Sequence, residues 1–130
     1  MTGRRDSASG RAGGKLILLG EHAVVRGTAA VAVCLANGTS VEATWGEGPT
    51  ALEVESWGLS SRVDGDRPAD AALLALVVAL GAPREGISLR GCSSLPSRAG
   101  LGASASIAAA SARAIEGLVG AAARQLHQLL

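Results

Sequence analysis

The sequence predicts an α+β fold in which a mixed, partly antiparallel sheet carries helices on one face. Segments with strand patterns fill the first half of the chain, and the second half alternates helix, strand, glycine-rich loop and helix. The 130 residues are 48% hydrophobic and 18% charged, which suits one domain with its own core and argues against a disordered chain.

The N-terminal third predicts extended segments. Residues 1–12 are polar and are expected to form a flexible leader. The apolar run Lys15–Leu19 lies between glycines and predicts a short buried strand. Ala29–Leu35 is apolar as well, and the Asn-Gly pair at residues 37–38 predicts a tight turn after it.

Two alternating segments predict a hairpin with one solvated face. Thr39–Trp45 and Ala51–Glu55 both alternate polar and apolar residues. We expect Gly46–Pro49 to join them, so that part of the sheet is antiparallel. Arg62–Arg67 is expected to be a charged loop.

The second half predicts helices on either side of a further strand. Pro68 suits a first helical turn, and Ala69–Leu80 is apolar on nearly every side, so this helix is expected to be well buried. Gly86–Arg90 predicts a strand. Ala103–Val119 predicts a second long helix, which Gly120 is expected to end before another helix begins. Its apolar face is expected to comprise Ile107, Ala110, Ala114, Ile115 and Leu118.

Composition excludes several classes of function. A net charge of +1 gives no basic surface for nucleic acid or for an anionic membrane. The apolar runs are too short to span a bilayer and no signal peptide is evident, so we expect a soluble cytoplasmic protein. Cys34 and Cys92 lie far apart in the sequence and are expected to be buried free thiols, not metal ligands.

The clearest chemistry lies in the glycine-rich stretch 93–106. Gly100 and Gly102 open directly into a predicted helix. The first N–H groups of a helix have no intrahelical partner and lie at the positive end of its dipole, so this stretch predicts a cradle for a di- or triphosphate. Ser104 and Ser106 add hydroxyls that could bind phosphate or magnesium.

The residues of this loop leave two other interpretations open. The loop could be a helix cap without a ligand. It could also be a dinucleotide fingerprint, because Gly100, Gly102 and Ala105 fit G-x-G-x-x-A. That second interpretation is weaker, because a long loop precedes the glycines and the nearest acidic residue, Glu116, lies inside the helix. The Walker pattern does not occur in the sequence.

The stretch from Pro96 to Ser106 resembles the phosphate-loop signature of the GHMP kinase superfamily, P-x-x-x-G-L-G-S-S-[AS]-[AS]. The sequence departs from it at Ala103, where the family usually has serine, and retains Ser104. The resemblance implies that Ser104 helps to hold Mg²⁺. It also implies that the ATP phosphates are bound by Ser93, Arg98, Ala99, Gly100, Leu101, Gly102, Ala103 and Ser104.

A second stretch, Lys15–Gly27 with the two glycines before it, resembles the mevalonate kinase signature P-G-K-x-x-L-x-G-E-H-A-V-V-x-G and departs from it at Gly13, where the family has proline. The resemblance implies that Lys15, the only lysine of the chain, is catalytic, and that Glu21 and His22 belong to the substrate pocket. The residues alone leave alternatives open. Lys15 could be a solvated side chain, and Glu21 and His22 could stiffen the turn by local hydrogen bonds.

Together the two resemblances imply ATP-dependent phosphorylation of mevalonate to phosphomevalonate, with magnesium, in isoprenoid precursor synthesis. They also imply the GHMP kinase N-terminal domain over residues 13–130, a fold like the second domain of ribosomal protein S5. The first alternative is another GHMP kinase that acts on a sugar, homoserine or a different isoprenoid intermediate. The second is a non-catalytic nucleotide-binding remnant.

The chain is expected to be an incomplete kinase. In the family, a catalytic aspartate, a carboxylate ligand for magnesium and a third glycine-rich motif lie beyond the helix that follows the phosphate loop. This sequence stops at Leu130, within an apolar helical pattern. We therefore expect little kinase activity from the isolated chain. A homodimer is considered only for a full-length protein.

Overall fold

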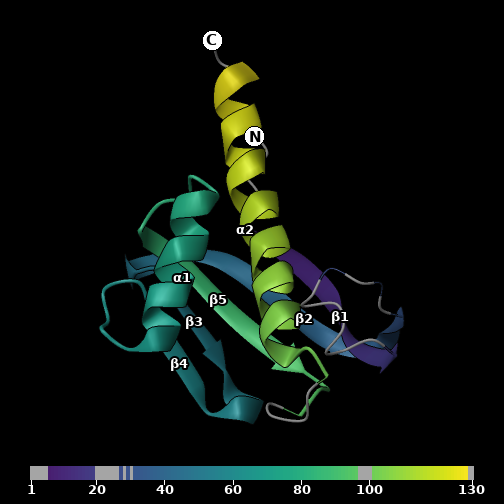
Figure 1. Cartoon of the computed structure of the whole chain (residues 1–130). Helices are drawn as coiled ribbons and strands as arrows, with labels where there is room; N and C mark the ends of the chain where they lie inside the picture. The colour runs from purple at the N-terminus through teal and green to yellow at the C-terminus, as the bar shows by residue number, and fades with distance from the viewer. Residues whose placement is uncertain (1–5, 20–26, 28, 30, 97–100, 129–130) are drawn as a thin grey trace.

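The computed structural model describes residues 6–19, 27, 29, 31–96 and 101–128. Its described elements form a five-stranded sheet with two helices packed on one face (Figure 1). The sheet order is β1-β2-β5-β3-β4, with β3 parallel to β5 and the other neighbours antiparallel. The α+β prediction is confirmed. In chain order the elements are β1 (Ser7–Leu19), β2 (Val31–Pro49), β3 (Ala51–Val54), a 3-10 turn (Glu55–Trp57), β4 (Leu59–Arg62), α1 (Pro68–Ala79), β5 (Glu85–Ser93) and α2 (Ala103–Gln128).

The first strand begins well before the expected position. Residues 7–12, which the sequence suggested as part of a flexible leader, pair with Thr39–Thr44 on β2. The reason is close packing: a Cβ added at Gly10 would collide with the carbonyl oxygen of Ala110 and lie 2.6 Å from the Ala114 nitrogen. Small residues are required where α2 lies directly on β1, and they lack the apolar signal of a strand.

The second strand passes through the pair predicted to be a turn. Gly38 lies inside β2 and pairs with Gly13, and a Cβ added at Gly38 would collide with the Ala12 carbonyl oxygen. A register irregularity between Gly13 and Lys15 falls at the same place. The glycines here allow two strands to approach closely, so the predicted turn at 37–38 is wrong.

The hairpin expected across Gly46–Pro49 is also wrong. β2 pairs with β5, as at Trp45 and Ile87, and not with β3. β3 lies on the other side of β5, parallel to it, and forms its hairpin with β4. Alternation identified the strands, but the pairing depends on contacts between distant segments.

Both helices follow the predicted order. α1 agrees with the expected range but is buried on one side only, through Asp70, Leu73 and Val77, while Val78 is 53% exposed. α2 continues through Gly120 and extends beyond the sheet (Figure 1), which corrects the expected break. The apolar face expected for this helix is confirmed, since Ala110, Ala114, Ile115 and Leu118 are buried and Ile107 packs against the same core.

Both cysteines are exposed, contrary to the expectation of buried thiols. Cys92 belongs to the alternating exposed set of β5, which also contains Ser88 and Arg90. Cys34 pairs with Lys15 in the stretch of β2 that precedes its pairing with β5. Within the described helices, none combines the length and the hydropathy that a membrane crossing requires.

Candidate functional site

The fold brings Lys15 on β1 against the start of α2. The Lys15 backbone nitrogen donates a hydrogen bond of 2.8 Å to the Leu101 carbonyl oxygen. A Cβ added at Gly102 would lie 2.7 Å from Lys15 Cγ and 3.5 Å from Lys15 Cε. The aliphatic stem of the lysine therefore crosses Gly102, and two motifs far apart in the sequence lie in contact.

Two glycines make this crossing sterically feasible. Gly102 has a φ of +77°, in the left-handed region that favours glycine. A Cβ added at Gly14 would lie 2.7 Å from Leu95 Cδ2 and 2.8 Å from the Leu101 oxygen. A side chain at Gly14 would push β1 and the loop apart, and one at Gly102 would displace the Lys15 stem, so the contact depends on both residues being glycine.

The first turn of α2, next to Lys15, begins with amides that have no acceptor within the helix. Its first helical hydrogen bond runs from the Ser106 nitrogen to the Gly102 oxygen, at 2.8 Å. The N–H groups of Ala103, Ser104 and Ala105 precede this bond and have no acceptor within the helix. The helix dipole places positive potential at the same end, so an anion is favoured there. The Ser104 side chain is exposed at this turn.

Ser106 has a structural role instead of the ligand role considered from the sequence. Its hydroxyl is buried and donates a 2.9 Å hydrogen bond to the Ala12 carbonyl oxygen. This bond joins the first turn of α2 to β1. The hydroxyl therefore stabilises the position of the turn and is not free for phosphate or magnesium.

Ser93 lies at the end of β5 in a local network. Its hydroxyl oxygen accepts a hydrogen bond from the Leu95 nitrogen at 3.1 Å and is 2.8 Å from the Thr39 hydroxyl oxygen. These contacts hold the chain as it enters the glycine loop. A phosphate contact of Ser93 remains a prediction.

The predicted residues Arg98, Ala99, Gly100, Glu21 and His22 lie outside the described residues. The entrance to the loop is held by described residues, because the Trp57 indole nitrogen donates a 2.9 Å hydrogen bond to the Leu95 carbonyl oxygen. The Ser94 nitrogen likewise donates to the Gly38 oxygen at 3.0 Å.

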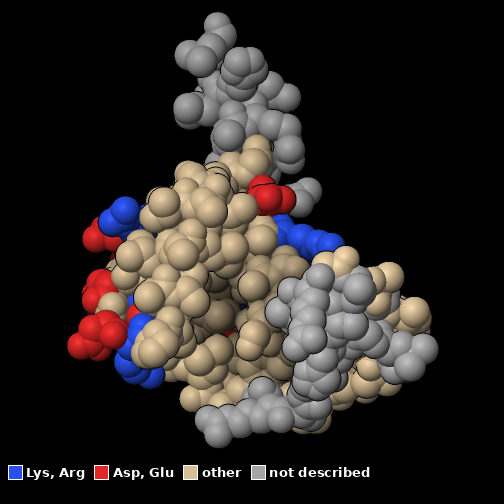
Figure 2. Space-filling model, viewed as in Figure 1, with Lys and Arg blue, Asp and Glu red and all other residues tan. Residues whose placement is uncertain are grey.

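A hollow of about 610 Å³ opens beside the first turn of α2. It lies between α1, α2 and the β3–β4 end of the sheet, and Ser104 and Trp57 are among its lining residues. Its described lining carries no charged side chain. In Figure 2, most of the charged side chains of the visible described surface lie toward its margins. The hollow thus suits a neutral, largely apolar group.

One hydroxyl in this hollow lacks a partner. Ser111 on α2 lines the hollow and is 1% exposed, and its oxygen has no hydrogen-bond partner among the described residues. A buried hydroxyl without a partner costs about 1–3 kcal/mol. Ser111 was not among the residues predicted from the sequence, where its one signal is that a serine interrupts a run of alanines.

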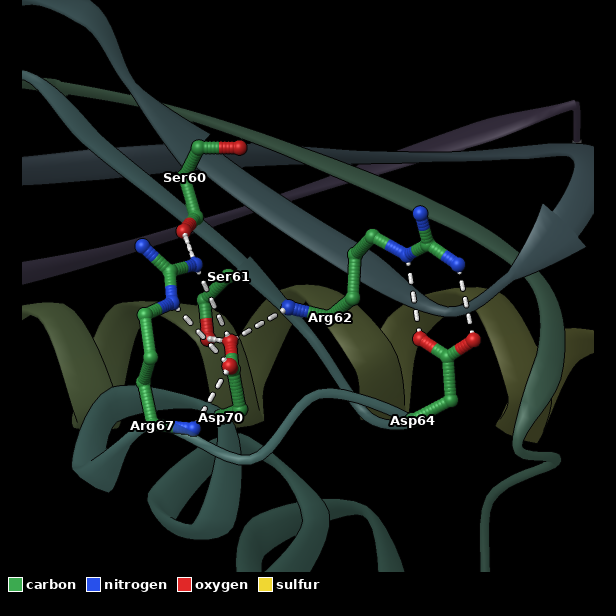
Figure 3. Close-up of polar contacts among 6 residues, drawn as sticks. All are labelled: Ser60, Ser61, Arg62, Asp64, Arg67 and Asp70. Carbon is green, nitrogen blue, oxygen red and sulfur yellow. Dashed lines mark hydrogen bonds and ion pairs between the residues drawn. The ribbon is translucent and has the colours of Figure 1, made fainter.

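A carboxylate network supports one wall of the hollow (Figure 3). Asp70 accepts hydrogen bonds from the Ser61 hydroxyl at 3.0 Å, the Arg62 amide at 2.9 Å and the Arg67 amide at 3.0 Å. The Arg67 guanidinium also donates to both of its oxygens. The Arg67 side-chain bond, followed by the two amides, holds the pKa of Asp70 well below its ordinary value. Because Ser61 lines the hollow, this network sets how α1 meets β4 there.

Solved structures with a similar fold are small-molecule kinases. Mevalonate kinase from methicillin-resistant Staphylococcus aureus is 31% identical over 89% of this chain, with a TM-score of 0.60. Methanococcus jannaschii mevalonate kinase is 23% identical over 93% of the chain, with a TM-score of 0.68. Lactococcus lactis galactokinase, solved with galactose, is 19% identical over 81%, with a TM-score of 0.62.

The chain spans only part of these proteins: 40%, 42% and 31% of their respective lengths. Neither the known protein-family profiles nor the curated protein sequences give a match. The likeness therefore rests on three-dimensional structure, together with the 31% identity to the staphylococcal protein.

Proposed function

We propose, on the premise that this chain is built on the fold of the GHMP kinases, that it binds a nucleoside triphosphate as the N-terminal part of a small-molecule kinase. One observation carries the proposal: the stem of Lys15 crosses Gly102 at the start of α2, beside amides that have no acceptor within the helix. A cation and a set of amides in one place suit a polyphosphate.

The phosphates would lie on the amides of Ala103, Ser104 and Ala105, with the ammonium of Lys15 beside them. An ammonium is a compact charge, and placed near a transferring phosphoryl group it stabilises the charge that develops there. Arg98, Ala99 and Gly100 are proposed to complete the cradle. The neutral hollow would take the nucleoside, and its volume falls within the range usual for small-molecule sites.

Magnesium is proposed to bind with the nucleotide, held by phosphate oxygens and the Ser104 hydroxyl. Oxygen ligands suit this ion, and magnesium in kinases is commonly bound through a few protein oxygens and the substrate phosphates. Ser104 fits because its side chain is exposed at the first turn of α2. Among the described residues, no group of three or more His, Cys, Asp and Glu side chains could hold a metal ion. When bound, the ion would neutralise phosphate charge.

The acceptor is proposed to be mevalonate, with Glu21 and His22 in its pocket. Two of the three reported relatives are mevalonate kinases, and the stretch 15–27 resembles that family. The galactokinase likeness favours keeping a sugar as an alternative acceptor. Assaying the chain, joined to the remaining domain of a relative, against mevalonate, galactose and homoserine would decide between them.

The nucleotide proposal is tested with Lys15→Ala. Mg-ATP should raise the melting temperature of the natural chain, because a ligand that binds only the folded state stabilises it. The Lys15→Ala variant should lose most of that rise. Arg90→Ala is the matched control, because it removes a cation from an exposed position of β5 on the alternating set facing away from the core. Equal stabilisation of natural chain and Lys15→Ala by Mg-ATP would refute the proposed role.

A further inference from the structure

The Ser111 hydroxyl, which lacks a partner among the described residues, lies on the same face of α2 as Ser104 in the first turn. Ser104, Ile107, Ala108 and Ser111 all line the hollow, at the spacing of one helix face. Ser111 lies seven positions after Ser104, and therefore about 10 Å further along the helix. A ligand with its phosphates at Ser104 and a group extending along this face would bring that group to Ser111.

Buried serines elsewhere in the described fold have protein partners. The Ser61 hydroxyl donates to Asp70, and the Ser106 hydroxyl donates to the Ala12 carbonyl. A helical serine commonly bonds back to a carbonyl of the preceding turn, yet among the described residues Ser111 has no such bond. Its hydroxyl is buried and lines a space large enough for a small molecule.

The chemistry of the lining narrows the class of group that would meet this hydroxyl. No charged side chain is among the described residues of the hollow, so the group is uncharged. A hydroxyl both donates and accepts hydrogen bonds, which suits the edge of a heterocyclic ring that carries ring nitrogens and an amino or carbonyl group. The Trp57 ring, fixed by its bond to the Leu95 oxygen, also lines the hollow and offers an aromatic surface for a planar group.

We propose that Ser111 is a specificity-determining residue that hydrogen-bonds the polar edge of a nucleobase seated in the hollow. This inference rests on the proposed nucleotide function and adds the residue that recognises the base. It assigns the phosphate end and the base end of one ligand to two serines on a single helix face, Ser104 and Ser111. The bound base would then supply the hydrogen-bond partner that the Ser111 hydroxyl lacks among the described residues.

The test measures the affinities of Mg-ATP and of inorganic tripolyphosphate, which lacks a base, by calorimetry. The natural chain should bind ATP at least tenfold more tightly than tripolyphosphate. Ser111→Ala should weaken ATP binding about three- to tenfold, equivalent to about 0.6–1.4 kcal/mol, and leave tripolyphosphate unchanged. Ser88→Ala, at an exposed position of β5, is the matched control and should alter neither affinity.

A structural role for Ser111 would give a different result. Removing a hydroxyl without a partner should not lower the melting temperature of the free chain, whereas removing a structural hydrogen bond should. Ser111→Cys, which keeps the size of the side chain but donates weakly, provides a second variant should the alanine variant fail to fold. It should weaken ATP binding in the same way.

The outcomes separate this inference from the function on which it rests. Unchanged ATP affinity in Ser111→Ala, or an equal loss for ATP and tripolyphosphate, would overturn the role of Ser111 and leave phosphate binding intact. Equal affinity of the natural chain for ATP and tripolyphosphate would overturn it without any variant. A natural chain that binds neither ligand would remove the proposed function and this inference together.

Discussion

Replacing Gly102 with alanine should damage ligand binding more than it damages the fold. The residue has a φ of +77°, and a left-handed conformation costs an ordinary residue about 1–2 kcal/mol. The new Cβ would also lie 2.7 Å from Lys15 Cγ, within the distance at which atoms must move. The lysine stem is the part that can give way, so the substitution should displace the ammonium from the start of α2.

Gly81→Ala is the matched control for this prediction. Gly81 has a φ of +64°, and nothing lies within 4 Å of the Cβ that alanine would add. Both variants should therefore lose about 1–2 kcal/mol of unfolding free energy in urea, through backbone strain alone. Only Gly102→Ala should also lose Mg-ATP affinity, by tenfold or more, measured by calorimetry below the melting transition. Equal ATP affinity in the two variants would refute the argument that Lys15 needs a glycine beside it.

Three further predictions concern how the site is held. Ser106→Ala removes the hydrogen bond to the Ala12 carbonyl and should lower the unfolding free energy in urea by about 1 kcal/mol. Loss of tripolyphosphate binding without loss of stability would show instead that Ser106 binds the phosphate. Because the folded state lowers the pKa of Asp70, the contribution of this carboxylate to stability should be full above about pH 4, the unfolded value, and should fall as acid protonates it. Asp70→Asn should therefore flatten the pH dependence of the unfolding free energy, measured in urea between pH 2 and 5. An unchanged slope would contradict this. Gly10→Ala should collide with the Ala110 carbonyl and lower the melting temperature by several degrees, and an unchanged melting curve would show that α2 does not lie on β1 as described.

The sequence predicts the order of the elements well and their pairing poorly. Alternation and helix periodicity are local, and they identified α1, β5 and the buried face of α2. The glycines misled because the same residue serves two purposes. Gly38 lies inside a strand that passes close to Ala12, while its neighbour Asn37 made the pair look like a hairpin turn.

The motifs of Lys15 and of the start of α2 could be recognised from the sequence, and the hollow could not. Lys15 and the Gly102–Ser104 segment have short sequence patterns, and the fold brings them into contact. Trp57 and Ser111 come from a 3-10 turn and from the middle of a helix, and nothing local relates one to the other. Asp70 had the pattern of a first-turn acid after proline, yet its tie to Ser61 depends on the packing of α1 against β4.

The contacts between β1 and α2 also govern when the site can exist during folding. β1 is the first described strand and α2 the last described helix, yet Lys15 bonds to Leu101 and Ser106 bonds to Ala12. Nearly the whole described chain must be synthesised before these bonds can close, and such long-range closure is slow compared with forming a hairpin. A ligand bound at the start of α2 should stabilise the packing of α2 on the sheet. Ligand binding should therefore slow amide hydrogen exchange more at the start of α2 than in β3 or β4.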